Sequence, residues 1–132
     1  MSISTGRRKS LRWLSGIIAA GALCGPMSST ASACTASAFI SDTYNEWVNW
    51  SGNAVGCYST WTYSWRIRLY KNGTVLDEHV REGLGGSTSY STPSYSNFEI
   101  GPVRGQGYST TFFIYHSATV GNNKVDQASR SL

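Results

Sequence analysis

Residues 61–80 read WTYSWRIRLYKNGTVLDEHV, and they give the clearest indication of the fold class. From Trp61 to Leu69, aromatic and aliphatic residues occupy every second position, and threonine, serine and arginine fill the positions between them. An alternation with a period of two is typical of a β-strand that buries one face. Asn72-Gly73 then supplies two residues that tolerate the positive φ angles of a type I′ turn. The stretch therefore predicts a β-hairpin.

A two-residue turn also fixes the register of a hairpin. The turn at Asn72-Gly73 places Leu69 opposite Leu76 and Arg68 opposite Asp77. The apolar pair then lies on one face and the opposite charges on the other, an arrangement that stabilises paired strands.

The rest of the chain after residue 33 also favours strands. All four Phe, all eight Tyr and four of the five Trp lie there, among many Ser, Thr and Gly residues. Further strands are expected at 36–41, 44–50, 54–58, 97–100 and 108–119, a loop or edge at 83–96, and a frayed tail from about 121. About seven short strands predict an all-β fold, a small two-sheet antiparallel β-sandwich in one domain at 34–132.

Residues 1–33 carry the pattern of a secretory signal peptide. Four of the 11 basic side chains lie in the first twelve residues, an apolar stretch follows at 13–24, and the segment ends in Ala31-Ser32-Ala33. The apolar stretch is shorter than the roughly 20 residues that span a bilayer. We expect cleavage after Ala33 and secretion of the remainder. The pair Arg7-Arg8 leaves the general secretory and twin-arginine routes both open.

Two cysteines remain after cleavage, Cys34 and Cys57. An even count in an exported chain indicates a disulfide, which here closes a loop of about 23 residues and is worth roughly 3 kcal/mol. Lipid anchoring of Cys34 is the alternative. It is disfavoured because a run of small and polar residues separates Cys34 from the apolar stretch, and because it would leave Cys57 without a partner.

The net charge of +4 belongs to the N-terminal segment. After residue 33, seven basic side chains face seven acidic ones. Nucleic-acid and anionic-membrane binding need a clustered basic face, and none is visible in the sequence. We therefore expect a monomer with no nucleic-acid partner and no membrane insertion after signal cleavage.

No pattern typical of a catalytic or metal site is present. His79 and His116 lack a nearby nucleophile motif and a second ligand at metal-binding spacing, so they are expected as surface residues of strands. Asp77 and Glu78 are adjacent on a predicted strand and so point to opposite faces. The sequence favours a protein that is not an enzyme and holds neither a metal nor a cofactor.

The segment between the two cysteines holds the best candidates for binding: Trp47, Asn49, Trp50 and Asn53. Exposed indole rings stack on the C–H faces of sugars while amides bond their hydroxyls, and Trp also anchors protein interfaces. We expect these residues to bind a carbohydrate or an extracellular protein. The alternative is that Val48 and Trp50 pack inward and Trp47 covers an edge.

Two motifs resemble those of immunoglobulin-like domains. The run from Trp65 to Gly73, followed by Leu76, resembles their third strand and its turn. Gly105-Gln106-Gly107-Tyr108 resembles the corner before their sixth strand, where a Tyr hydroxyl bonds back to the backbone. Thr110 stands where the second intersheet cysteine usually lies, so the usual disulfide is absent. The resemblance implies an immunoglobulin-like β-sandwich and, by itself, no function.

A weaker likeness is to the tendamistat-type α-amylase inhibitors, which are small secreted sandwiches. It rests on the order Tyr44, Trp47, Gly56-Cys57, the long strand, Ile100, Val103 and Gly107-Tyr108. That family inhibits through a Trp-Arg-Tyr turn. The matching triplet here is Trp47-Val48-Asn49, and the family's second disulfide is missing. This likeness implies inhibition of a secreted hydrolase as an alternative function, and an antimicrobial or toxin role is a further alternative.

The signal and disulfide assignments predict the mass of the secreted form. Intact-mass spectrometry should find a chain that begins at Cys34 and lacks the two hydrogens lost in forming the Cys34–Cys57 bridge. A diacylglyceryl adduct on Cys34 would contradict both assignments.

Overall fold

A computed structural model describes residues 33–132. This range contains strands, turns and loops but no helix, and hence none long and apolar enough to cross a membrane. The eight strands are β1 (Thr35–Thr43), β2 (Trp47–Val55), β3 (Thr62–Lys71), β4 (Thr74–Gly85), β5 (Ser89–Ser91), β6 (Tyr95–Phe98), β7 (Tyr108–Tyr115) and β8 (Lys124–Ser131).

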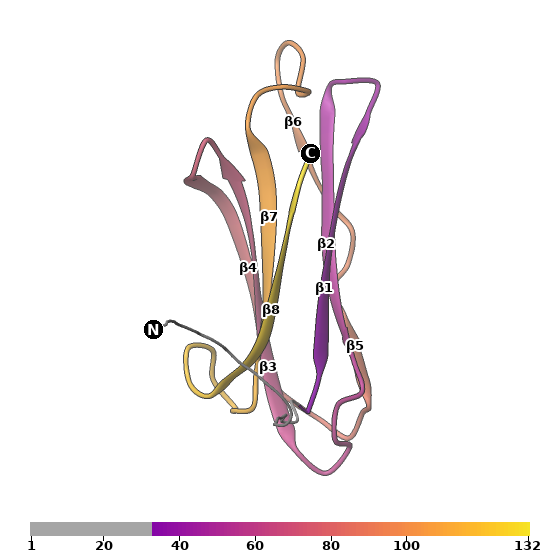
Figure 1. Ribbon diagram of the computed structural model, residues 1–132, viewed down its shortest axis with the longest axis vertical. Helices are drawn as coiled ribbons and strands as arrows, with labels where there is room; N and C mark the ends of the chain where they lie inside the picture. The colour runs from indigo at the N-terminus through magenta and orange to yellow at the C-terminus, as the bar shows by residue number, and fades with distance from the viewer. Residues whose placement is uncertain (1–32) are drawn as a thin grey trace, which may run out of the picture. The chain divides into compact units, whose positions relative to one another are not determined.

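The strands form two antiparallel sheets that lie face to face (Figure 1). The first sheet has the order β1-β2-β5, with β6 also paired to β2, and the second has the order β4-β3-β7-β8. β1 and β2 pair along their full length, from Thr35 with Val55 to Thr43 with Trp47. The predicted all-β two-sheet sandwich is therefore confirmed.

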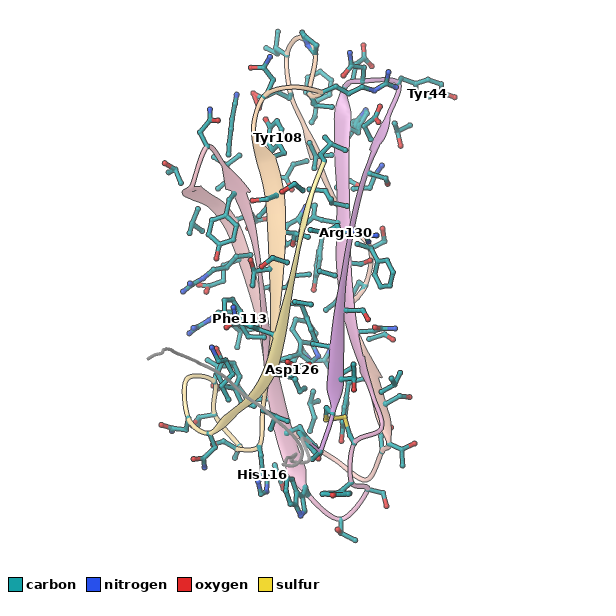
Figure 2. All side chains as sticks on the ribbon, viewed as in Figure 1. Tyr44, Tyr108, Phe113, His116, Asp126 and Arg130 are labelled. Atoms are coloured by element: carbon teal, nitrogen blue, oxygen red, sulfur yellow. A yellow bond between two sulfur atoms is a disulfide. The ribbon has the colours of Figure 1, made fainter. Side chains whose placement is uncertain are left out.

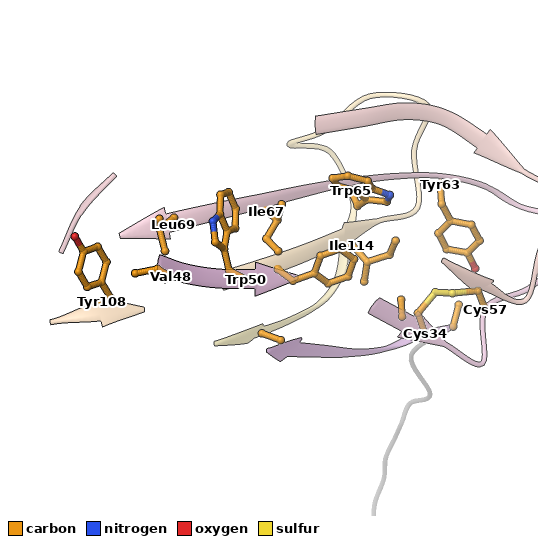
Figure 3. Close-up of a cluster of buried hydrophobic side chains, with 14 of the residues drawn as sticks. Cys34, Val48, Trp50, Cys57, Tyr63, Trp65, Ile67, Leu69, Tyr108 and Ile114 are labelled. Atoms are coloured by element: carbon orange, nitrogen blue, oxygen red, sulfur yellow. A yellow bond between two sulfur atoms is a disulfide. The ribbon is translucent and has the colours of Figure 1, made fainter. Parts of the chain in front are cut away.

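The core lies between the inner faces of the two sheets. Trp65, Ile67 and Leu69 of β3 are buried, as their alternation predicts, and they pack with Trp50 of β2 and Phe112 of β7 (Figure 3). Period-two alternation on both sheets thus supplies one apolar layer.

The predicted hairpin forms, but its register was predicted wrongly beyond the turn. Next to the turn, Lys71 pairs with Thr74 and Tyr70 with Val75, as expected. A β-bulge follows and leaves Leu76 without a cross-strand partner. Leu69 consequently faces Asp77 instead of Leu76. The extra residue turns Glu78 to the outer face.

On the outer face of the second sheet, two arginines form ion pairs with the Glu78 carboxylate, where a single pair between Arg68 and Asp77 was expected. Its Oε2 lies 2.9 Å from Nε of Arg66 and 2.8 Å from Nε of Arg68. A bulge that brings one carboxylate between two guanidinium groups offers a physical reason for the shifted register.

The expectation of a frayed tail from about 121 is corrected by β8, which pairs with β7 from Ser109–Ser131 to Tyr115–Lys124. Its side chains also reach the first sheet: Asp126 Oδ2 accepts the backbone N–H of Ala36 at 2.9 Å. Polar residues dominate β8, so its hydrophobic alternation is too weak to predict a strand. The segment 83–96, expected as a loop or an edge, contains the end of β4, the short strand β5 and the start of β6, and β5 lies at an edge of the first sheet. The fold thus has eight strands where about seven were expected.

The predicted disulfide between Cys34 and Cys57 is present, and both cysteines are buried. It ties the residue before β1 to the turn after β2 (Figure 3). Both ends of the β1–β2 hairpin are thereby closed, one by the turn and the other by the covalent bridge.

The two sheets make a close approach at Gly52. A Cβ atom built at this position would lie 2.5 Å from both Cγ and Cδ1 of Phe112, inside van der Waals contact. The Phe112 ring therefore lies directly on the backbone of β2, and only glycine leaves the room that this requires.

Gly52→Ala should lower the free energy of unfolding by about 1–3 kcal/mol, because the added methyl group overpacks the core. Gly85→Ala is the matched control. A Cβ there meets only the Trp61 carbonyl oxygen, at an ordinary 3.6 Å. Urea denaturation should place the two midpoints clearly apart, and equal midpoints would contradict the proposed role of Gly52.

Candidate functional site

The alternation along β2 separates the four predicted binding residues. Trp47, Asn49 and Asn53 lie on the outer face of the first sheet, whereas Trp50 points into the core. An odd spacing of three residues between Trp47 and Trp50 forces this division, since successive strand side chains point to opposite faces. Trp47 is 40% exposed and Trp50 only 1%.

Trp50 is held firmly in its inner position. Its ring packs against Tyr95 and His79, with centroid separations of 5.0 and 5.4 Å. Its Nε1 donates a hydrogen bond to Oδ1 of Asn97 at 3.0 Å, so the one polar atom of the indole is satisfied. The expectation that Trp50 binds a ligand beside Trp47 is therefore corrected: Trp50 belongs to the core, and Val48 and Trp50 both pack inward, as the alternative interpretation has it.

The outer face of the first sheet carries polar side chains and exposed aromatic rings. Strand pairing places Phe39 opposite Ser51, Ser41 opposite Asn49, and Asn53 between Ser37 and Ser91. On the other side of β2, Ser96 lies opposite Asn49 and Phe98 opposite Trp47. We call the set Phe39, Ser41, Trp47, Asn49, Ser51, Asn53, Ser96 and Phe98 the outer face.

Trp47 and Phe98 form an aromatic pair on this face. Their ring centroids lie 5.2 Å apart at an interplanar angle of 59°, and Phe98 is 55% exposed. The pair presents two adjacent π-surfaces to solvent. Phe98 was not a candidate from the sequence, because its proximity to Trp47 arises only from the pairing of β6 with β2.

The amide of Asn49 is fixed in orientation by its neighbours. Its Nδ2 donates to Oγ1 of Thr43 at 2.7 Å, and its Oδ1 accepts from Oγ of Ser96 at 2.7 Å. A primary amide has two donor hydrogens and two acceptor lone pairs, so one of each remains for a ligand. Asn49 thus offers a preorganised donor and acceptor next to the aromatic pair.

A groove of about 320 Å³ lies beside these residues. Half of its lining comes from the outer face, namely Phe39, Ser41, Asn49 and Ser51. The other half consists of Ser94, Arg130 and two inward-facing residues of β1 and β2, Ile40 and Trp50. The groove therefore combines one exposed ring, several hydroxyl and amide groups, and one guanidinium group.

The turn before Trp47 is anchored to the loop that precedes β7. Oδ1 of Asn45 accepts the backbone N–H groups of Val103 and Arg104, at 3.0 and 2.9 Å. Oδ2 of Asp42 accepts from Nη2 of Arg104 at 3.0 Å, and this bond lowers the pKa of the Asp42 carboxyl. Tyr44, at the tip of the same turn, remains 86% exposed (Figure 2).

The two histidines lie in aromatic stacks, where the sequence suggested simple surface positions. His79 stacks on Tyr95 at a centroid distance of 3.7 Å, and His116 stacks on Trp61 at 3.5 Å. His79 Nε2 also lies 3.2 Å from Oδ2 of Asp77. Within residues 33–132, no three His, Cys, Asp or Glu side chains are grouped so as to hold a metal ion.

Comparison with known proteins gives no match, whether to protein-family models, to curated proteins or to solved structures.

Replacing Arg104 by Gln should raise the pKa of the Asp42 carboxyl toward its ordinary value, because the guanidinium bond is the largest cause of its lowering. A carboxyl whose pKa is lowered by folding contributes stability above its unfolded pKa, and that contribution is lost as the pH falls through the folded value. Carboxyl-carbon NMR titration of both proteins measures the shift. An unchanged Asp42 titration would show that Arg104 does not anchor this turn.

Proposed function

We propose that the protein is a secreted, non-catalytic domain that binds a carbohydrate on the outer face of its first sheet. The observation that carries the proposal is the exposed Trp47–Phe98 pair beside the oriented amide of Asn49. An aromatic face covers the apolar C–H groups of a sugar ring, and the amide exchanges hydrogen bonds with its hydroxyls.

The composition of the outer face supports a sugar over most other ligands. Its eight residues include no charged side chain: three are serines, two are asparagines and three are aromatic. Serine hydroxyls and asparagine amides both donate and accept, as sugar hydroxyls do. Because the residues stand on paired strands, little conformational freedom is lost when a ligand binds.

The proposal places the protein outside the cytoplasm. The Cys34–Cys57 disulfide supports this, because such bonds persist in oxidising compartments. The basic start, apolar stretch and Ala31-Ser32-Ala33 ending of the N-terminal segment support export as well. The proposed mature chain then begins at the disulfide.

An immunoglobulin-like identity for the sandwich is part of the proposal. Variable-type immunoglobulin domains extend the sheet of their third, sixth and seventh strands with a further strand, as β4 extends β3-β7-β8. The buried Trp65 on β3 and Tyr108 at the start of β7 support the likeness. The hydroxyl of Tyr108 donates to the Glu99 carboxylate, so the expected bond from the corner tyrosine to the backbone is replaced by one to a side chain, and this departs from the likeness. Burial raises the pKa of the Tyr108 hydroxyl to about 12.

Inhibition through a tendamistat-type triplet receives less support. The triplet Trp47-Val48-Asn49 lies within β2, and Val48 is fully buried. An inhibitory turn would have to present all three side chains to an enzyme, whereas strand alternation presents only two. Hydrolase inhibition is therefore an outcome that the binding experiment must be able to reveal.

The Trp47→Ala variant should bind the glycan that the native protein retains about 10-fold or more weakly, because it removes an exposed ring of the kind that dominates binding energy. The experiment is a pull-down of the secreted protein on insoluble glucan, chitin, peptidoglycan and uronate polysaccharides, followed by calorimetry with soluble fragments of the glycan retained. Phe98→Ala should weaken binding as well, because it removes the other ring of the pair.

Tyr58→Ala is the matched control, since Tyr58 is an exposed aromatic residue in the loop between β2 and β3, apart from the outer face. It should bind like the native protein. Full affinity in both outer-face variants would overturn the proposal. Stoichiometric loss of a hydrolase's activity, abolished by Trp47→Ala, would replace it with the inhibitor function.

A further inference from the structure

Arg130 brings a positive charge from the second sheet into the groove of the first. It lies on β8 opposite Thr110, whose side chain is buried between the sheets. Figure 2 labels Arg130 on β8, from which its Nη1 reaches to 3.4 Å from the carbonyl oxygen of Ala38 on the edge strand β1. Arg130 also lines the groove. The groove is thus built by both sheets.

The charge of Arg130 is not balanced by a neighbouring acid. Four other cations are paired: Lys71 with Glu99, Arg104 with Asp42, and Arg66 and Arg68 with Glu78. In the part of the chain that the structure describes, Arg81 and Lys124 also lack a carboxylate partner, but neither lines the groove. Within residues 33–132, no carboxylate lies within 4.0 Å of the Arg130 guanidinium. One contact with a carbonyl at 3.4 Å engages at most one of its five N–H donors.

The other residues that line the groove carry no charge. The guanidinium therefore sets the sign of the electrostatic potential there, and it favours an anion. A planar guanidinium pairs best with a carboxylate, which it can bind through two parallel N–H···O bonds.

The remaining lining suits a sugar ring attached to that anion. Phe39 is 47% exposed and offers a stacking surface, while Ser41 and Asn49, which face each other across β1 and β2, offer hydroxyl and amide groups. A volume of about 320 Å³ lies at the small end of ligand sites, which run from roughly 300 to 1,000 Å³. A site of this size takes part of a chain, such as one or two sugar rings.

We infer that the groove recognises an acidic polysaccharide, with Arg130 binding the carboxylate of a uronic acid residue while Phe39 stacks on its ring. This inference rests on the proposed function, because it names the class of glycan that the outer face would bind. Trp47 and Phe98 then hold neighbouring sugar rings of the same chain, since Trp47 precedes Asn49 by two positions on the same face of β2.

The test compares acidic and neutral forms of the same sugars. Calorimetry of the secreted protein should show that fragments of polygalacturonate or alginate bind at least 10-fold more tightly than their methyl esters. Arg130→Gln should remove this difference, leaving acid and ester equal. Arg130→Lys should retain part of it, because the charge remains but the two-bond geometry is lost.

Lys124→Gln is the matched control for charge. It removes one positive charge from β8, but Lys124 lies beside Phe113 on the opposite outer face, with its Nζ 5.9 Å from that ring. Lys124→Gln should keep the preference for the acid. Thermal melting of each variant reports whether the fold is retained.

Several results would overturn the inference. Equal binding of acid and ester by the native protein, with the Trp47 dependence intact, would leave the proposed function standing and remove only the role of Arg130. An equal loss in the Arg130 and Lys124 variants would reduce the effect to net charge. Tighter binding of polyglutamate than of the uronates would assign the groove to an acidic peptide, and no binding of any glycan would overturn both proposals.

Discussion

The contact between Phe112 and the backbone of Gly52 sets the distance between the two sheets. No side chain at position 52 separates the ring from β2, so the inner faces approach closely at this point. The larger rings of Trp50 and Trp65 then pack within the same apolar layer. Protein interiors are packed to near crystalline density, so a larger side chain at position 52 would displace the side chains around this contact. The outer face of the first sheet is the reverse side of this same strand, so the position of its side chains depends on how β2 packs against Phe112.

The sequence was informative wherever a pattern was local. The alternation from Trp61 to Leu69, the Asn72-Gly73 turn and the pairing of two cysteines each depend on neighbours in the chain or on simple counting. The bulge at Leu76 depends instead on where two arginines of another strand can share Glu78, and no local pattern reports this. β8 escaped prediction for a related reason, since its polar residues form a strand only because β7 offers them a partner. The strand predicted at 97–100 is present as β6, but it begins two residues earlier, where Tyr95 pairs with Trp50 of β2.

For the candidate site, the sequence located the strand but not the surface. Trp47, Asn49 and Asn53 were predicted together with Trp50, and alternation alone could have separated them, since the even-numbered positions of β2 are buried. Phe39, Phe98 and Arg130 could not have been found in this way. They come from three other strands, and they meet β2 only through the register of the first sheet and the approach of β8 to β1.

The seam between β1 and β8 links the proposed binding groove to the integrity of the sandwich. Asp126 accepts the N–H of Ala36, and Arg130 approaches the carbonyl of Ala38, so side chains of one sheet cover backbone groups at the edge strand of the other. Unpaired edge groups invite association with other chains, and covering them is a recognised protection. A ligand that engages Arg130 and Phe39 together contacts both sides of this seam. Such a ligand binds only the folded sandwich, so its binding free energy adds to the stability of the seam that creates its site.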